Sequence, residues 1–129
     1  MKKILIVDDD PAIRDVIAES LEGYEIIFAS DGSEGVARVK KEKPDLVLMD
    51  MSMPKLSGLN ALKRIRGDSE IMKTPVILIT GYGSVADIEE GFSAQANDYI
   101  VKPFSPGKLR AKVDILLAQA GSGPVTRMP

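Results

Sequence analysis

Short runs of aliphatic residues recur along the chain and alternate with segments in which the apolar residues have helical spacing. The runs occupy residues 4–7, 25–29, 45–49, 75–80 and 98–101. Three of these runs are continuous rather than alternating, as is typical of parallel strands that are covered on both faces. We therefore predict an α/β fold of five strand–helix pairs, in which a parallel sheet is built with right-handed crossovers.

Each segment between the runs contains apolar residues that would share one face of a helix. The first segment has Ile13, Val16, Ile17 and Leu21, with Ser20 on the same face; the second has Val36 and Val39; the third has Leu59, Leu62 and Ile65; the fourth has Val85, Ile88 and Phe92; and the last has Leu109, Val113, Leu116 and Leu117. The second segment has the weakest pattern. On the third segment, the basic residues Lys63, Arg64 and Arg66 are expected to face solvent.

Helix start signals agree with these segments. Asp10 precedes Pro11 and Ser105 precedes Pro106, which is typical of an N-cap followed by proline at the first helical position. Ser57 is suited to cap the third helix. We therefore expect Asp10 to begin a helix rather than to take part in chemistry.

The composition limits the function. The chain has 129 residues, enough for one domain with a core, and its formal charge of −2 argues against direct nucleic-acid binding. Cysteine and histidine are both absent, which excludes disulfides, thiolate metal ligands and any histidine within the chain that carries a phosphoryl group. The N-terminal apolar run is too short for a signal peptide or a membrane span, so a cytoplasmic protein without membrane contact is expected.

We expect a single domain over residues 1–120. Residues 121–129, GSGPVTRMP, are rich in glycine and proline and have no apolar period. They are expected to form a flexible tail or the start of a linker.

Polar side chains stand where the predicted strands end. Asp8 and Asp9 follow the first strand, Asp50 the third, Thr80 the fourth and Lys102 the fifth. The carboxyl ends of parallel strands lie at one edge of a sheet, where doubly wound folds bind their ligands. If the first and third strands are neighbours, three carboxylates meet in one crevice beside a hydroxyl and an ammonium group.

Three adjacent carboxylates repel one another, and a hard divalent cation removes the conflict. Mg²⁺ prefers oxygen ligands and attracts phosphate-bearing ligands. A lysine and a threonine nearby suit phosphoryl transfer, in which a carboxylate can act as the nucleophile. The strand ends thus predict a Mg²⁺-dependent phosphoryl site.

Several segments resemble the receiver domain of two-component response regulators. They are VDDD (7–10), LVLMDMSMP (46–54) with Ser-Gly at 57–58, ILITGYG (77–83) and NDYIVKPF (97–104). They stand in the family's order and spacing, and the resemblance covers residues 2–119. It implies a doubly wound, flavodoxin-like sheet of strand order 2-1-3-4-5 and a receiver of the chemotaxis single-domain type.

The resemblance also implies roles for individual residues. Asp50 would accept the phosphoryl group. The metal ligands would be Asp8, largely through water, Asp9, Asp50 and the backbone carbonyl of Ser52. Thr80 and Lys102 would contact the phosphoryl oxygens, Thr80 and Tyr99 would form a switch, and the bond before Pro103 would be a cis peptide.

One residue departs from the family. Gln95 stands where receivers often have glycine, before Ala96-Asn97-Asp98. If that position ends the fourth helix in a left-handed conformation, glutamine costs about 1 kcal/mol or more. The shape of the output face, formed by the fourth helix, fifth strand and fifth helix, would change with it.

The resemblance further implies partners. The phosphoryl donor would be a phosphohistidine on a sensor histidine kinase or a histidine phosphotransfer protein, recognised around Ile13, Arg14, Ile17 and residues 103–105. The output would be a downstream target protein, a further phosphorelay step or a missing effector domain. Such a domain promotes its own phosphorylation and dephosphorylation and is not a turnover enzyme.

Two alternatives remain open from the sequence. The start ILIVDDDP also resembles haloacid-dehalogenase phosphatases, in which Asp8 would be the nucleophile and Asp10 the general acid. That family requires another acidic pair after the lysine, whereas here only Asp114 follows, within a predicted helix. The second alternative is an interaction module that does not use phosphate.

Overall fold

The computed structural model describes residues 1–53, 55–81 and 85–120. In chain order the elements are β1 Lys3–Val7, α1 Pro11–Ser20, β2 Glu25–Ala29, α2 Gly32–Glu42, β3 Leu46–Asp50, α3 Gly58–Arg66, β4 Val76–Gly81, α4 Val85–Ser93, β5 Asp98–Lys102 and α5 Pro106–Ala120. The predicted tail 121–129 lies outside the described residues. No helix among the described residues is both long and apolar enough to cross a membrane.

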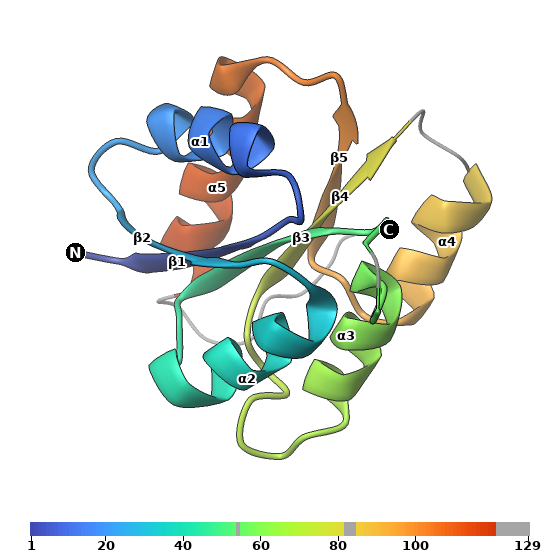
Figure 1. Ribbon diagram of the computed structural model, residues 1–129. Helices are drawn as coiled ribbons and strands as arrows, with labels where there is room; N and C mark the ends of the chain where they lie inside the picture. The colour runs from blue at the N-terminus through green and yellow to red at the C-terminus, as the bar shows by residue number, and fades with distance from the viewer. Residues whose placement is uncertain (54, 82–84, 121–129) are drawn as a thin grey trace.

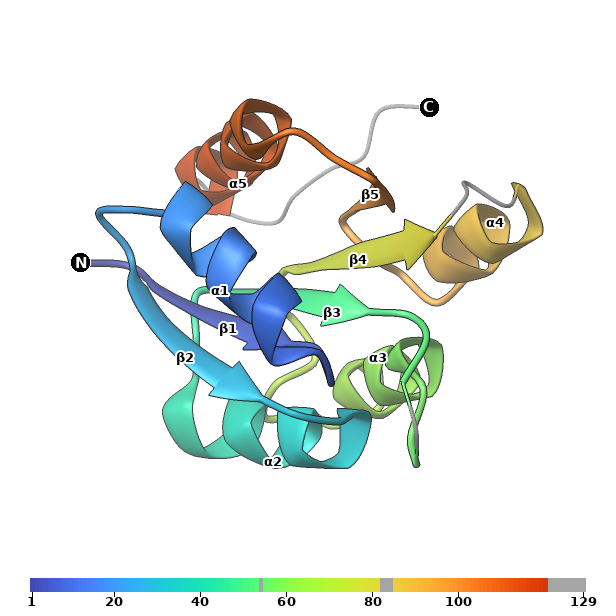
Figure 2. The same cartoon turned by 45° about the horizontal axis from the view of Figure 1, so that its top comes forward.

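All five strands form one parallel sheet with the order β2-β1-β3-β4-β5, as predicted. Helices α1 and α5 cover one face of this sheet, and α2, α3 and α4 cover the other (Figure 1). The turned view shows the strand arrows directed toward the same edge (Figure 2). The polar residues that follow the strands are therefore gathered at that edge.

The core has one layer on each face of the sheet. Side chains from alternate positions of β1, β3 and β4 pack against α1 and α5 on one face and against α2 and α3 on the other. Every residue of β3 is buried. This two-sided burial explains why the central strands are continuous apolar runs rather than alternating ones.

The predicted apolar face of α1 is partly wrong. Ile17 and Leu21 are fully buried and Ile13 packs against the same cluster, but Val16 is 47 % exposed. The buried stripe of α1 therefore follows i, i+4 and i+8, and Ala18 completes its contact with the cluster. Since α1 packs against both β1 and α5, a narrow stripe is enough to seal it.

Side chains cap the helices where the sequence predicts it. The Asp10 carboxylate accepts a hydrogen bond from Ala12 N at 2.9 Å, and Ser57 Oγ accepts one from Asn60 N at 3.2 Å. Ser105 Oγ accepts in the same way from Lys108 N at 3.1 Å. Each cap satisfies a backbone N–H that the first turn leaves without a helical partner.

Two residues after α4, Gln95 terminates the helix in a left-handed conformation, with φ 70°. Ala96 N donates to Gly91 O and Gln95 N donates to Phe92 O, which is the hydrogen-bond pattern of a Schellman motif. Ala96 itself is buried. This left-handed position, which is usually glycine where helices end in this way, is therefore filled here by a residue with a Cβ atom.

Arg66 is half-buried and bonds to backbone rather than projecting into solvent, so the prediction for this residue is wrong. Its Nε donates to Gln95 O at 2.9 Å, and its two Nη atoms donate to Met72 O, Thr74 O and the Asn97 side chain at 2.6–3.1 Å. Burial lowers the pKa of this guanidinium. Because α3 ends beside the loop before β4 and the end of α4, its last arginine bonds to both, whereas Lys63 and Arg64 are exposed.

Candidate functional site

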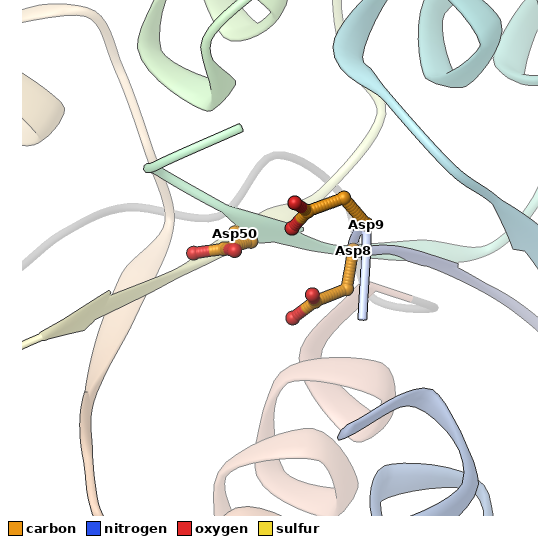
Figure 3. A group of neighbouring side chains, drawn as sticks. All are labelled: Asp8, Asp9 and Asp50. Atoms are coloured by element: carbon orange, nitrogen blue, oxygen red, sulfur yellow. The ribbon is translucent and has the colours of Figure 1, made fainter. Parts of the chain in front are cut away.

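Three carboxylates meet at the carboxyl edge of the sheet. One oxygen from each of Asp8, Asp9 and Asp50 lies within 4.8 Å of one from each of the others. Figure 3 shows their side chains projecting into a common space from the ends of β1 and β3. Asp8 and Asp50 are buried, with 1 % and 5 % exposed, whereas Asp9 is exposed.

Strand pairing places these carboxylates together. Val7 of β1 pairs with Met49 of β3, so that the next residues, Asp8 and Asp50, are neighbours. Backbone hydrogen bonds to the flanking strands, at 3.1 Å from Asp8 N to Ala29 O and 2.9 Å from Met51 N to Ile79 O, extend the sheet past both strand ends. Both carboxylates are therefore fixed by the sheet rather than by loops.

A lysine from a third strand compensates the two buried carboxylates. Lys102 Nζ, at the end of β5, lies 3.7 Å from Asp8 Oδ2 and 3.6 Å from Asp50 Oδ1. The Lys102–Pro103 bond that follows is cis. A single ammonium therefore lies between two carboxylates, and the described cluster keeps an excess of negative charge.

The electrostatics of the two buried carboxylates differ from those of ordinary aspartates. Burial raises the pKa of Asp8, and the neighbouring charge of Asp50 raises it further. Burial also raises the pKa of Asp50, although the Lys102 ammonium and the Ser52 backbone N–H oppose the rise. The charged forms are therefore only partly compensated, which is the condition that a bound cation relieves.

One oxygen atom shows where that compensation is incomplete, because the Lys102 ammonium 3.7 Å away is its charged neighbour but not a hydrogen-bond donor to it. Asp8 Oδ1 accepts a hydrogen bond from Asp10 N at 2.9 Å, but the buried Asp8 Oδ2 has no hydrogen-bond partner among the described residues. Buried carboxylate oxygens without a donor are costly, and they suit a hard cation. The donor set of three carboxylates therefore fits Mg²⁺.

Comparison with known proteins agrees with this geometry. The response regulator receiver domain family matches residues 4–114 of the chain. The chain belongs to the response regulator receiver domain family. Receiver domains are signalling switches of two-component systems rather than turnover enzymes.

Solved receivers have the same fold. The chemotaxis protein CheY4 of Vibrio cholerae is 33 % identical, with a TM-score of 0.84 over 90 % of this chain and 98 % of that one. A CheY-like receiver domain protein from Methanospirillum hungatei is 34 % identical, with a TM-score of 0.87 over 95 % of this chain and 98 % of that one. These matches are to chains of similar length.

Curated relatives are longer. A probable transcriptional regulator, ycf27 of Cyanophora paradoxa, is 43 % identical over 90 % of this chain and 48 % of that protein. The DNA-binding dual master transcriptional regulator RpaA of Synechocystis is 38 % identical over 96 % of this chain and 52 % of that protein. The chain spans about half the length of the curated relatives it matches.

The receiver places Thr80 and Tyr99 on one face of the sheet. Leu78 pairs with Tyr99 across β4 and β5, and Thr80 follows Leu78 at the next position that points to the same face. Both side chains, with Phe92 and Ile88 of α4, line a narrow space between that helix and the sheet. The Thr80 hydroxyl is buried and donates to Gly81 O at 3.3 Å.

Ser52 lies just past β3 and is exposed. Its backbone N–H donates to Asp50 Oδ1 at 3.3 Å, so the loop after β3 turns back over the carboxylate. Pro54 and Tyr82, which belong to the receiver motifs, lie outside the described residues.

The residues that a phosphatase of the haloacid-dehalogenase type requires are not gathered. Asp10 is exposed and caps α1, and it is not part of the carboxylate group. Asp114 lies on α5, where it accepts a hydrogen bond from Tyr24 and pairs with Arg110. Together with the family match, this geometry overturns the phosphatase alternative.

The end of β2 carries a contact that the sequence pattern does not predict. Asp31 caps α2 by accepting from Glu34 N at 2.8 Å, and its other oxygen lies 3.7 Å from Lys55 Nζ in the loop after β3. Gly32, the next residue, is buried against the backbone of Leu56. Asp-Gly before a helix was the available signal, but it did not reveal the contact with a loop that is distant in the sequence.

Proposed function

We propose that this receiver is a phosphorylation-dependent switch in which Asp50 accepts a phosphoryl group from a phosphohistidine on a partner protein. The observation that carries the proposal is the buried pair of Asp8 and Asp50, with Lys102 Nζ 3.7 Å and 3.6 Å from them. The chain has no histidine, so the donor imidazole belongs to a sensor histidine kinase or a histidine phosphotransfer protein.

In the transfer, one oxygen of Asp50 forms a bond to phosphorus while the P–N bond of the donor breaks. The electron pair of that bond stays with the imidazole nitrogen. Asp8, Asp9, Asp50 and the backbone carbonyl of Ser52 would hold Mg²⁺. When bound, this ion supplies positive charge that offsets the charge of the phosphoryl oxygens.

Lys102 and Thr80 would recognise the phosphoryl group. Lys102 already lies beside Asp50 Oδ1, and its ammonium would pair with a phosphoryl oxygen. The Thr80 hydroxyl would exchange its hydrogen bond to Gly81 O for one to another phosphoryl oxygen. These two side chains come from β4 and β5, so the phosphoryl group would connect three strands of the sheet.

The same exchange would operate the switch. Tyr99 shares the space under α4 with Thr80, and its ring contacts Phe92 of that helix edge to face at 5.6 Å between centroids. Movement of Thr80 toward Asp50 would let Tyr99 turn inward and release its contact with α4. The face formed by α4, β5 and α5 would then bind a downstream target protein or an effector domain.

Intact mass spectrometry after incubation with acetyl phosphate tests the proposal. We expect one added phosphoryl group that requires Mg²⁺, is absent from Asp50→Ala and persists in Asp10→Asn. Asp10→Asn is the matched control because asparagine also caps helices. Turnover of phosphate esters that depends on Asp10 and survives loss of Asp50 would contradict the proposal.

Beryllofluoride, which mimics a phosphoryl group, separates fast hydrolysis from a lack of phosphorylation. If no adduct accumulates, Mg²⁺-dependent NMR shifts at Asp50, Thr80 and Tyr99 on addition of beryllofluoride would still support the proposal. Unchanged shifts at all three residues would favour an interaction module that does not use phosphate.

A further inference from the structure

The connection from β3 to α3 carries the proposed metal ligand Ser52, and its described residues, 51–53 and 55–57, are held by close backbone contacts near both ends. At its end, Gly58 N donates to Met51 O at 3.2 Å, and a Cβ atom on Gly58 would lie 2.0 Å from Asp50 O. The end of the loop is thus closed directly onto the backbone of the proposed phosphoacceptor.

The second contact comes from the first residue of α2. A Cβ atom on Gly32 would lie 2.2 Å from Leu56 O and 3.1 Å from Leu56 Cβ. No side chain at this position fits without moving backbone, because the nearest atom is a carbonyl oxygen. Gly32 has an ordinary negative φ, so close approach rather than left-handed geometry requires the glycine.

Asp31 adds a charged contact to the same loop. Its carboxylate caps α2 with one oxygen and lies 3.7 Å from Lys55 Nζ with the other. Lys55 has a left-handed backbone, with φ 65°, which a non-glycine residue adopts only when neighbouring contacts support it. The N-cap and the first residue of α2 therefore support the loop at Lys55 and at Leu56, respectively.

Helix α2 is itself firmly seated, so the loop rather than the helix would move. Gly35, one turn after Gly32, packs against the Val7 side chain of β1, and Val39 is fully buried. A shift of α2 away from the sheet would expose both contacts. We therefore expect a methyl group at position 32 to displace Leu56 by about 1 Å or more, enough to change a ligand geometry substantially.

We propose that Gly32, supported by Asp31, is a positioning residue for the phosphoacceptor site. It fixes Leu56, two residues before Gly58, and Gly58 in turn bonds to Met51, the neighbour of Ser52. This inference rests on the proposed function, since it concerns the affinity of that site for Mg²⁺. Neither residue belongs to the group formed by Asp8, Asp9 and Asp50 among the described residues, so both would act through the loop.

Titration with MgCl₂ in wild type, Gly32→Ala and Gly35→Ala tests the inference, with calorimetry and the NMR shifts of Asp9 and Asp50 as readouts. Gly35→Ala is a matched control because it adds the same methyl group to the same helix against a side chain instead of the loop. We expect Gly32→Ala to raise the Kd for Mg²⁺ by about tenfold or more and Gly35→Ala to change it less than twofold.

The outcomes separate the two proposals. If wild type shows no response to Mg²⁺ at Asp9 and Asp50, the proposed function fails. If wild type binds Mg²⁺ and folded Gly32→Ala binds it equally well, only the positioning role is overturned. Urea unfolding in the absence of Mg²⁺ ensures that the variants compared are folded.

A milder pair of variants keeps the inference testable if Gly32→Ala does not fold. Asp31→Asn retains a helix cap but removes the charge that faces Lys55, and Lys55→Met removes the same ion pair from the loop side. Lys55 is largely exposed, so we expect each variant to raise the Kd for Mg²⁺ by only about two- to fivefold. A Kd unchanged in both would contradict the role of Asp31.

Discussion

Replacement of Arg66 by methionine tests how strongly α3 holds the end of α4. Methionine keeps an unbranched apolar stem of similar reach but removes every donor. The two half-buried hydrogen bonds, at 2.6 Å to Thr74 O and 2.9 Å to Asn97 Oδ1, are expected to contribute about 1–1.5 kcal/mol each. The more exposed bonds to Gln95 O and Met72 O contribute about 0.5 kcal/mol each.

The Asn97 side chain limits the loss. Its Oδ1 also accepts from Val76 N at 2.9 Å, so this oxygen keeps a partner when Arg66 is removed. We therefore expect Arg66→Met to lower the free energy of unfolding by about 2–4 kcal/mol. Urea unfolding followed by circular dichroism would show this as a midpoint lower by about 1–2 M.

Arg64→Met is the matched control, because Arg64 lies on the same helix and is exposed. Its effect is expected to stay within about 0.5 kcal/mol. Arg66→Lys should recover little of the loss, since a single ammonium does not reproduce the fork of a guanidinium. Equal losses in Arg66→Met and Arg64→Met would refute the reasoning.

Three further substitutions follow from the structure. Gln95→Gly should raise the free energy of unfolding by about 1 kcal/mol, measured by urea unfolding, because glycine adopts φ 70° without strain. Gly58→Ala should lower it by about 2–4 kcal/mol in the same assay, since the new methyl group meets Asp50 O; a smaller loss than for Gly107→Ala, where the space is open, would contradict this. For Asp8, burial raises the folded-state pKa above the ordinary 3.8, so wild-type stability without divalent cations should fall as pH rises from about 3.8. Asp8→Asn should reduce that fall to the part that Asp50 contributes, because burial raises the pKa of Asp50 as well, and it should be more stable than wild type at pH 7 in EDTA; a steeper fall in the variant would contradict the sign.

The central strands were predictable because both of their faces are buried. A strand between two helix layers is apolar along its length, and residues 4–7, 46–49 and 76–79 within the predicted runs have this property. The observed β3 and β4 lie one residue further on, at Leu46–Asp50 and Val76–Gly81. The reason for the shift of β3 is that Asp50 pairs with Ile79. A prediction from apolar residues ends the strand before Asp50, whereas the backbone pairing includes this charged residue.

The carboxylate group was predictable for a related reason. Once the strands are parallel, the residues after them share one edge, and Asp8, Asp9 and Asp50 needed only the adjacency of β1 and β3 to meet. The burial of two of them and their distances to Lys102 required the structure. Pattern alone also misjudged Arg66, because its partners are mostly backbone carbonyls, and no residue type marks where these carbonyls point.

The contacts at the two ends of α3 connect the site at one end of the helix with the output face at the other. Gly58 at its start lies against the carbonyl of Asp50, and Arg66 at its end bonds to the carbonyl of Gln95, where α4 ends. Helix α3 is closely packed, so it resists displacement. It therefore restrains both the loop after Asp50 and the end of α4. The contacts of Thr80 and Tyr99 lie under α4 itself. We therefore expect the α4 end that Arg66 holds to stay in place while the remainder of α4 responds to Thr80.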